Sequence, residues 1–510
     1  MTPKRARLRA CVLSWCMNSP TPGFVAAFPA APLRCIAPLL QAQFQVQYSA
    51  SRAHVGVPLA LRKDRLLRMQ SLISNHSAAL ADAVQADFGV RSPQLTEIAD
   101  MFVLRGLLSH SLKSLAGWMK PRRVHTPLYL KPSRAFVQRQ PLGVVGVVSP
   151  WNYPVQLALG PVITALAAGN RVMLKPSELT PATSQLLATL VGKSFASDEL
   201  CVVLGDAALA AAFCTLPFDH LFFTGSTEVG RKVATSAALN LTPTTLELGG
   251  KSPCVVDVSC TGAALDKAAL KIAHGKLLNA GQTCIAPDYV LLPRGMEAAF
   301  TAAFDKAVAQ LFPTVVGNPD YAAIISPRHL ARLEHMLVQA EADGARLHRC
   351  AATSLPAVGT GKARQMPPVL VFDTPFDATL LREEIFGPIL PVVPYDHIPG
   401  AMTHINAGPR PLALYWFGTD KAARDQLLAG TVSGGVTVND TLMHIAHENL
   451  PFGGVGASGW GSYHGEAGFL RLTHEKAVLV QSRFARGDLF YPPYGPRFDR
   501  VMGLIKRFVF

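Results

Sequence analysis

The chain has 510 residues, of which 49% are hydrophobic and 16% charged, and it contains 40 glycines and 39 prolines. This composition is typical of a compact globular protein of two or three domains and excludes a disordered or fibrous chain. The net charge of +14 does not indicate a nucleic-acid partner, because eight of the basic residues lie in 1–63, which holds no Asp or Glu, and the remaining chain carries only +6.

The N-terminal residues 1–60 are basic and are interrupted by Pro29, Pro32 and Pro38, with no sustained helical or strand period. A transit-like leader and an unstructured or mis-assigned extension are both open, and we expect the second, with regular structure beginning near Leu61. No run of 18 apolar residues occurs, so a transmembrane helix is not expected. The nine cysteines are scattered without a Cys-x-x-Cys pair, which predicts a reducing, cytoplasmic compartment and neither disulfides nor a structural metal site.

Two regions of alternating strands and helices follow a helical segment. From residue 61 to 119 apolar residues recur at three- and four-residue intervals, which predicts amphipathic helices. Short β-branched runs then predict strands beginning at residues 144, 171, 200, 220 and 244. A second region begins near Lys251, with predicted strands at 286–293, 387–394, 412–417 and 433–438. This alternation is typical of parallel sheets, so we expect two α/β domains with a cleft between them.

Three motifs place reactive side chains in turns at or near strand ends. Cys284 lies in NAGQTCIAP, Glu247 in LELGGKSP and Asn152 in VSPWNYP. Each has an ordinary alternative, as a buried structural thiol, a solvated charge and a turn residue, respectively. Together they supply a nucleophile, a carboxylate base and an amide donor for an oxyanion, and this combination favours thiol-based carbonyl chemistry.

The chain resembles the aldehyde dehydrogenase superfamily from about Leu61 to about Arg483. The motifs that carry the resemblance occur in family order: SPWNYP (149–154), LKPSE (174–178), FFTGSTEVG (222–230), TLELGGKSP (245–253), NAGQTCIAPD (279–288), EEIFGP (383–388) and PFGGVGASGWG (451–461). Residues 439–465 are most similar to the coniferyl-aldehyde dehydrogenase group, relatives of the class 3 and fatty aldehyde enzymes. The resemblance implies NAD(P)-dependent oxidation of an aromatic or aliphatic aldehyde to the carboxylic acid.

The resemblance also assigns catalytic roles. It makes Cys284 the nucleophile and Glu247 the base for the water that hydrolyses the thioester, with Asn152 and the backbone N–H of Cys284 holding the thiohemiacetal oxygen. An aromatic or long aliphatic pocket is expected from Tyr153, Tyr289, Leu442 and His444. The scattered histidines lack metal-ligand spacing, so no metal is expected.

A nicotinamide cofactor is implied although the chain lacks a Gly-x-Gly-x-x-Gly fingerprint. Gly225, Ser226 and Gly230 follow a strand and open a helix, where backbone can approach a pyrophosphate. The other residues that the resemblance assigns to the cofactor are Trp151, Lys175, Glu178, Glu384 and Phe386. As isolated residues, the charged pair at 175 and 178 would be surface charges and the Phe ordinary core. Glu178 would repel a 2′-phosphate and favours NAD, whereas Lys175 leaves NADP open.

Two other functions stay open. An acylating dehydrogenase of the same fold would pass the thioester to coenzyme A, but such enzymes generally lack the hydrolytic carboxylate, so Glu247 favours water as the acceptor. A catalytically silent relative kept for cofactor binding or structure is the second alternative. The presence of Cys284, Glu247 and Asn152 speaks against it.

The resemblance further implies a domain division and a homodimer. The expected parts are a cofactor-binding domain (61–248, with 132–142 in a small oligomerisation β-extension), a catalytic domain (249–445), a return to the cofactor domain with an oligomerisation strand (446–485) and a C-terminal tail (486–510). The tail has apolar residues at helical spacing with basic flanks, a pattern that suits an anionic membrane surface or docking on protein. We expect docking on protein, and neither a membrane nor a nucleic-acid partner.

Overall fold

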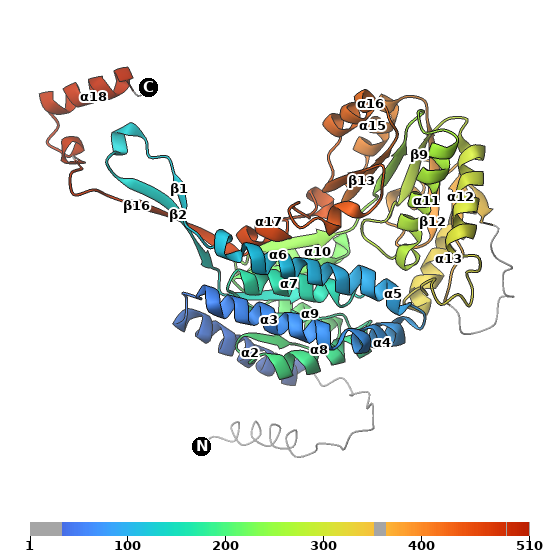
Figure 1. Cartoon of the computed structure of the whole chain (residues 1–510), viewed down its shortest axis with the longest axis horizontal. Helices are drawn as coiled ribbons and strands as arrows, with labels where there is room; N and C mark the ends of the chain where they lie inside the picture. Colours follow the sequence, from blue (N-terminus) through green and yellow to red (C-terminus); the bar gives the residue numbers. More distant parts are fainter. Residues whose placement is uncertain (1–32, 351–363, 486, 509–510) are drawn as a thin grey trace, which may run out of the picture. The chain divides into compact units, whose positions relative to one another are not determined.

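The computed structural model describes residues 33–350, 364–485 and 487–508. The described residues from 40 onward cluster as one compact unit. This unit contains a six-stranded, a seven-stranded and a three-stranded sheet (Figure 1). The expected α/β class with two largely parallel sheets is confirmed. For residues 1–32, the expectation of an unstructured extension lies outside the described residues.

The six-stranded sheet has the order β15-β7-β6-β3-β4-β5, and all of its strands except β15 are parallel. The strands are β3 (Val144–Val148), β4 (Arg171–Lys175), β5 (Leu200–Val202), β6 (His220–Gly225), β7 (Thr244–Leu248) and β15 (Gly459–Trp460). All five predicted strands of this region are confirmed. Helices α7 (Gln156–Ala167), α8 (Pro181–Ser194), α9 (Ala207–Cys214) and α10 (Thr227–Ala238) connect them. Because the five strands are parallel, the turns after their carboxyl ends lie along one edge.

A helical layer covers α7, as the spacing of apolar residues predicts. It consists of α3 (Leu59–Asn75), α4 (Ser77–Phe88), α5 (Pro93–Thr96), the π-helical η1 (Glu97–Phe102) and α6 (Val103–Trp118). Helices α3 and α6 both contact α7, which in turn contacts β3 and β4. The apolar faces of this layer therefore enclose one core with α7.

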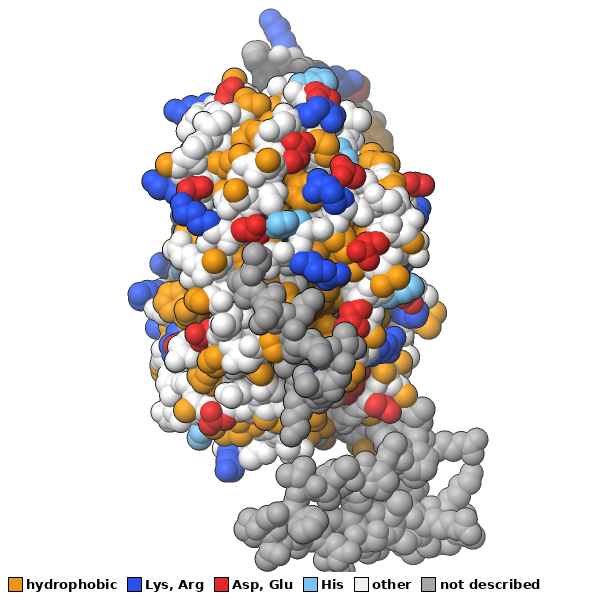
Figure 2. Space-filling view, turned by 90° about the vertical axis from the view of Figure 1, so that its right-hand side faces the viewer, with side chains coloured by type: hydrophobic (Ala, Val, Ile, Leu, Met, Phe, Trp, Pro, Cys, Tyr) orange, Lys and Arg blue, Asp and Glu red, His pale blue; other side chains and the backbone are white. Residues whose placement is uncertain are grey.

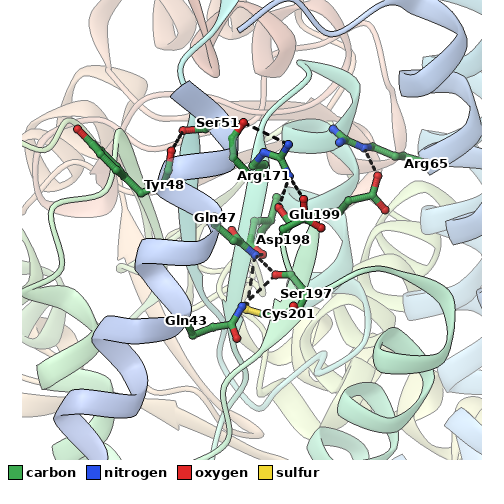
Figure 3. A network of polar contacts seen from close by, with 12 residues as sticks. Gln43, Gln47, Tyr48, Ser51, Arg65, Arg171, Ser197, Asp198, Glu199 and Cys201 are labelled. Carbon is green, nitrogen blue, oxygen red and sulfur yellow. Dashed lines mark hydrogen bonds and ion pairs between the residues drawn. The ribbon is translucent and has the colours of Figure 1, made fainter. Parts of the chain in front are cut away.

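Helix α2 (Leu33–Ala53) corrects the expectation that regular structure begins near Leu61. Gln47 of this helix is fully buried, and its Nε2 donates to the backbone oxygens of Val172 (2.9 Å) and Ser197 (3.0 Å) at the edge of the six-stranded sheet (Figure 3). A polar side chain thus occupies the buried stripe of the helix, satisfied by backbone that is distant in sequence. Among the described side chains of that stripe, the apolar residues are only Leu40 and Phe44, so the apolar helical period is not sustained.

The seven-stranded sheet has the order β10-β11-β12-β9-β8-β13-β14, and only β10 is antiparallel to its neighbour. The strands are β8 (Pro253–Val256), β9 (Tyr289–Pro293), β10 (Arg346–Arg349), β11 (Val369–Phe372), β12 (Ile389–Tyr395), β13 (Ala413–Phe417) and β14 (Gly435–Val438). The four predicted strands correspond to β9, β12, β13 and β14. The helices of this region are α11 (Ala263–Leu277), α12 (Glu297–Leu311), α13 (Pro327–Ala342), α14 (Thr379–Arg382), α15 (Ile398–Ala407) and α16 (Lys421–Gly430).

A small antiparallel sheet joins two distant segments. It consists of β1 (Arg122–Val124), β2 (Arg134–Pro141) and β16 (Thr473–Val480). The short helix η2 (Leu128–Leu130) connects β1 to β2, and α17 (Gly465–Arg471) precedes β16. Strands β2 and β16 pair over their full length, from Thr473 opposite Pro141 to Val480 opposite Arg134. The two segments assigned to the oligomerisation extension therefore pair with each other. Their contact with a second subunit stays a prediction.

The C-terminal tail contains η6 (Gly487–Phe490) and the helix α18 (Pro496–Phe508), which confirms the helical spacing. Helix α18 contacts η6, and its apolar residues Phe498, Val501 and Met502 remain partly exposed. The main part of this chain therefore does not cover these side chains. Docking of the tail on a second subunit stays a prediction. Within the described ranges, no helix combines the length and the apolar character needed to cross a membrane.

One face of the molecule carries charges of both signs. On the face drawn in Figure 2, described Lys and Arg side chains are interspersed with Asp and Glu and form no continuous basic patch. Mixed charge of this kind gives no field that would attract a polyanion to that face.

Candidate active site

Cys284 lies in a tightly held loop between α11 and β9. The loop begins with η3 (Leu278–Gly281), where Asn279 (φ 52°), Ala280 (φ 53°) and Gly281 (φ 78°) all have left-handed backbone. Non-glycine residues adopt this conformation at a cost of about 1–3 kcal/mol, so the surroundings must impose it. The Gln282 amide does so by donating to the backbone oxygens of Asn279 (2.9 Å) and Ala323 (3.0 Å). The partly buried thiol of Cys284 is therefore presented by a rigid, strained turn.

Asn152 lies against this loop from the turn that follows β3. Its side-chain Nδ2 donates to the backbone oxygen of Gln282 at 3.1 Å, two residues before Cys284. Its backbone oxygen accepts from Nη1 of Arg91 at 2.5 Å, and Arg91 is itself paired with Asp100 at 2.6 Å in the protein interior. One Nδ2 proton of Asn152 remains for another acceptor, because an amide nitrogen carries two.

Glu247, near the end of β7, is buried without a hydrogen-bond partner among the described residues at either carboxylate oxygen. Burial raises its pKa well above the ordinary carboxyl value. Burial first, and then the carboxylates of Glu384 and Glu247, raise the pKa of Cys284 to about 12, although the backbone N–H groups of Cys284 and Ile285 oppose this rise. The two carboxylates thus lie within electrostatic reach of the thiol and make its deprotonation more costly.

Of the four predicted pocket residues, Tyr153 lies beside the Cys284 loop, and Leu442 and His444 are buried in the same region. The hydroxyl of Tyr153 is 2.6 Å from Oγ1 of Thr283, the neighbour of Cys284. Leu442 (φ 65°) is buried in the same core cluster that Cys284 contacts. The ring of His444 stacks on Phe452, with centroids 5.9 Å apart, and burial lowers its pKa to about 4.

The expectation that Tyr289 lines this pocket is corrected by the structure. Side chains alternate between the two faces of a strand, and Val290 of β9 belongs to the core cluster that Cys284 contacts, whereas Tyr289 and Leu291 belong to the cluster on the other face. The Tyr289 ring lies 5.3 Å from His404 of α15 and is almost fully buried. Its role is therefore packing.

The predicted pyrophosphate site has the form of a helix N-terminus. Ser226 caps α10 by accepting from the backbone N–H of Val229, and Gly225 is the last residue of β6. A Cβ atom at Gly230 would lie 2.7 Å from the end of the Leu248 side chain, so glycine lets α10 pack against β7 without displacing that leucine. The turn therefore offers free backbone N–H groups at the positive end of a helix, which suits an anionic ligand.

Two more groups of predicted cofactor residues are brought together. Lys175 is almost fully buried, and its Nζ lies 3.5 Å from the carboxylate of Glu178, which is 43% exposed. Trp151 and Phe386 contact edge-to-face, with ring centroids 5.5 Å apart. Glu384 accepts from the backbone of Gly250, and its Oε1 is buried without a hydrogen-bond partner among the described residues.

Glu384 has features that fit a ligand with hydroxyl groups. Burial and the nearby Asp288 raise its pKa to about 8, although Lys251 and Arg332 oppose this rise. A buried carboxylate oxygen without a partner is costly, and a ligand hydroxyl would satisfy it. The residues present thus fit a nicotinamide dinucleotide.

Three residues of this site carried no recognisable signal in the sequence. Arg91 holds the Asn152 turn, Tyr415 donates to the backbone oxygen of Ile285, and Tyr463 interacts electrostatically with both Glu247 and Cys284. All three are fully or almost fully buried and come from distant segments. Only a resemblance that included their neighbourhood could have assigned them, because no spacing rule links them to Cys284.

Comparison with known proteins decides the family. The model of the aldehyde dehydrogenase family matches residues 41–478. The chain belongs to the aldehyde dehydrogenase family. This aldehyde dehydrogenase is 45% identical to a probable coniferyl aldehyde dehydrogenase of Pseudomonas aeruginosa, over 91% of this chain and 95% of the relative. It is also 45% identical to a coniferyl aldehyde dehydrogenase of a Pseudomonas species, over 88% and 91% of the two chains.

Solved structures agree with this assignment. The substrate-bound state of Staphylococcus aureus AldH is 33% identical and superposes with a TM-score of 0.84, over 91% of this chain and 99% of the other. The indole-3-acetaldehyde dehydrogenase AldA of P. syringae, solved in complex with NAD+ and IAA, is 25% identical with a TM-score of 0.78, over 88% and 89%. The protein is accordingly an NAD(P)-dependent oxidoreductase that acts on an aldehyde.

Proposed function

We propose that this enzyme oxidises an aromatic aldehyde of the coniferyl type to the carboxylic acid, with NAD as the acceptor of the hydride and water as the acceptor of the acyl group. The observation that carries the proposal is that the Cys284 thiol lies within electrostatic reach of Glu247, a buried carboxylate without a hydrogen-bond partner among the described residues. The names of relatives at 45% identity support the substrate class.

In the proposed reaction, the thiolate of Cys284 attacks the aldehyde carbon. The free Nδ2 proton of Asn152 and the backbone N–H of Cys284 donate to the oxygen that becomes negative. A bound nicotinamide would supply the acceptor for the hydride lost from this carbon, and Glu384, Trp151 and Phe386 would hold it there. Glu247 then takes a proton from water, which displaces the thiol from the thioester and releases the acid.

The proposed substrate pocket consists of Tyr153, Leu442 and His444 around the Cys284 loop. The neutral imidazole of His444, stacked on Phe452, offers an aromatic edge rather than a charge. An aromatic ring with a conjugated aldehyde is flat and apolar, and such surroundings favour it over a charged substrate. An aliphatic aldehyde is the second candidate, since the same side chains would also contact an alkyl chain.

The proposed preference for NAD depends on Glu178. Its exposed carboxylate would accept from the adenosine ribose hydroxyls and repel a 2′-phosphate, whereas Lys175, held at 3.5 Å, reduces that repulsion. A Glu178→Gln variant is therefore expected to gain in kcat/KM with NADP relative to NAD. NADP turnover equal to NAD turnover in the wild type would contradict the preference.

A turnover screen tests the proposed function. Coniferyl-type, benzaldehyde-type and fatty aldehydes would each be assayed with NAD and NADP, with and without coenzyme A, and the product identified by mass spectrometry. We expect the free acid in every case and the highest kcat/KM for the coniferyl type. A coenzyme A thioester as the product would instead assign the acylating reaction, and a fatty aldehyde as the best substrate would replace the aromatic class.

The pH dependence of acyl-enzyme hydrolysis tests the proposed base. Only the carboxylate form of Glu247 accepts a proton, and burial shifts its pKa well above the ordinary value of 4.5. The hydrolysis rate should therefore keep rising with pH through this higher pKa and then level off. Stopped-flow decay of the acyl-enzyme measures this limb. The limb should persist in Glu448→Gln, which removes another buried carboxyl, of pKa about 7, and vanish in Glu247→Gln. The reverse outcome would assign the base to Glu448.

We further propose a cytoplasmic homodimer in which β2 and β16 contact the second subunit. Leu479 and Val480 at the end of β16 are about half exposed, as is Tyr129 in the loop that leads to β2. Exposed apolar residues at the end of a paired strand are typical of an interface. Light scattering of the full-length protein should give twice the monomer mass, and a monomer at micromolar concentration would contradict the proposal.

A further inference from the structure

Three side chains with different metal-binding atoms meet at the edge of the seven-stranded sheet. The Nε2 atom of His348 in β10 lies 2.8 Å and 3.0 Å from the two carboxylate oxygens of Asp305 in α12. Cys350, the residue after β10, is 1% exposed, and its thiol lies near the same carboxylate. One oxygen, one nitrogen and one sulfur atom from these residues all lie within 4.8 Å of one another.

This set of atoms matches the ligand chemistry of zinc. Zn²⁺ binds Cys sulfur, His nitrogen and carboxylate oxygen at about 2.0–2.3 Å in a tetrahedron, which places the ligand atoms roughly 3.3–3.8 Å apart. The observed group needs side-chain shifts of only about an ångström to reach that spacing. Asp305 and His348 are partly exposed, at 28% and 31%, so solvent can reach the group and supply a water as the fourth ligand.

The backbone holds the group in place without a metal. Cys350 donates its backbone N–H to Pro368 at 3.2 Å, and His348 pairs with Leu370 in the antiparallel β10–β11 ladder. Asp305 lies in α12, which packs along α11. Two independent elements, a helix and an edge strand, thus direct these side chains to one point. The ion pair between Asp305 and His348 does not involve the thiol.

The location separates this group from the site of oxidation. Strand β10 is the edge strand of the sheet, and β11 and β12 lie between it and β9, whose preceding loop carries Cys284. Edge strands have one unpaired side and need another anchor. A metal here would fasten β10 to α12 and would take no part in the reaction.

We propose that Asp305, His348 and Cys350 bind one Zn²⁺ that stabilises the attachment of β10 to α12. The cysteine spacing in the sequence gave no sign of this, because Asp305 is 43 residues before His348. Binding would replace the hydrogen bond between Asp305 and His348 and release the proton of the Cys350 thiol to solvent.

Cobalt and zinc titrations of the full-length protein test the proposal. A Cys284→Ser background removes the one partly exposed thiol among the described residues of the catalytic domain. Co²⁺ should give a thiolate-to-metal charge-transfer band and tetrahedral d–d absorption at one equivalent, and ZnCl₂ should displace it. His348→Gln and Asp305→Asn should each weaken binding on the order of tenfold or more, and Cys350→Ser should abolish the charge-transfer band.

Matched variants distinguish this site from other metal-binding groups. His335→Gln on the exposed face of α13 and Cys201→Ser at β5 should leave the cobalt spectrum and the zinc affinity unchanged. ZnCl₂ should raise the unfolding temperature of the parent protein but not that of His348→Gln, whose partly exposed position makes misfolding a minor concern. Absence of the charge-transfer band, or equal zinc affinity in His348→Gln and His335→Gln, would reduce the group to an ion pair beside a buried thiol.

Discussion

Replacing Cys284 by serine is expected to abolish hydride transfer to NAD. Burial already raises the pKa of this thiol to about 12 in the resting protein, and an alcohol at the same position is far harder to ionise. Serine is nearly the same size, so the loop held by Gln282 should remain in place. The measurement is NADH absorbance in single- and multiple-turnover assays.

A control separates this loss from a general effect of removing a thiol. Cys201 in β5 is partly buried and belongs to the edge of the other sheet, so Cys201→Ser should retain near wild-type turnover. The unfolding temperature of Cys284→Ser should match that of the wild type. If Cys284→Ser oxidised aldehyde at a rate close to that of the wild type, the nucleophile would have to be another residue.

The Glu247→Gln variant tests the second step of the reaction, the hydrolysis of the thioester. Hydride transfer should still occur once, giving a burst of NADH, and the acyl group should then remain on Cys284 because the amide cannot deprotonate water. Mass spectrometry of the Cys284 peptide should detect the adduct. A Glu247→Gln enzyme that turned over without a burst and without an adduct would remove Glu247 from thioester hydrolysis.

The fold could be predicted largely from the sequence because its signals are local. The strand starting at residue 144, for example, is a β-branched run bounded by Gly and Pro, and its burial on both faces is what a central parallel strand requires. Helix α2 escaped prediction because Gln47 occupies its buried stripe and finds its partners in backbone more than a hundred residues away. Local periodicity contains no information about such partners.

The candidate site was predictable to the extent that its residues lie in dense motifs. Cys284, Glu247 and Asn152 each follow or precede a turn whose residue types are distinctive. Tyr289 was expected in an aromatic or long aliphatic pocket, yet strand alternation directs its ring to the other face. Arg91 was missed for the opposite reason, since it lies far from the motifs in sequence and reaches Asn152 only in the folded chain.

Replacing Arg91 by methionine is expected to cost about 3–5 kcal/mol of stability, because it leaves the carboxylate of Asp100 buried without its ion-pair partner. The two side chains are fully buried and their closest atoms are 2.6 Å apart. Asp100 also accepts from the backbone N–H groups of Val155 (3.2 Å) and Gln156 (2.9 Å), so the pair holds the turn that carries Asn152. Both the unfolding transition and catalysis should therefore change.

The exposed ion pair between Arg294 and Asp396 provides the control, with side chains 61% and 62% exposed. Arg294→Met should shift the unfolding transition by less than about 1 kcal/mol, because solvent already screens that pair. The double variant Arg91→Met/Asp100→Leu should recover part of the lost stability, since it removes the unpaired charge.

Catalysis should not recover in the double variant, because the bond from Arg91 to the backbone oxygen of Asn152 is absent in both variants. The loss should appear in kcat more than in KM, as expected when an oxyanion donor is displaced from the position where charge develops. Two results would contradict this: an Arg91→Met variant with the same unfolding temperature as the wild type, or a double variant with full kcat. Either would make the buried pair a packing feature without influence on Asn152.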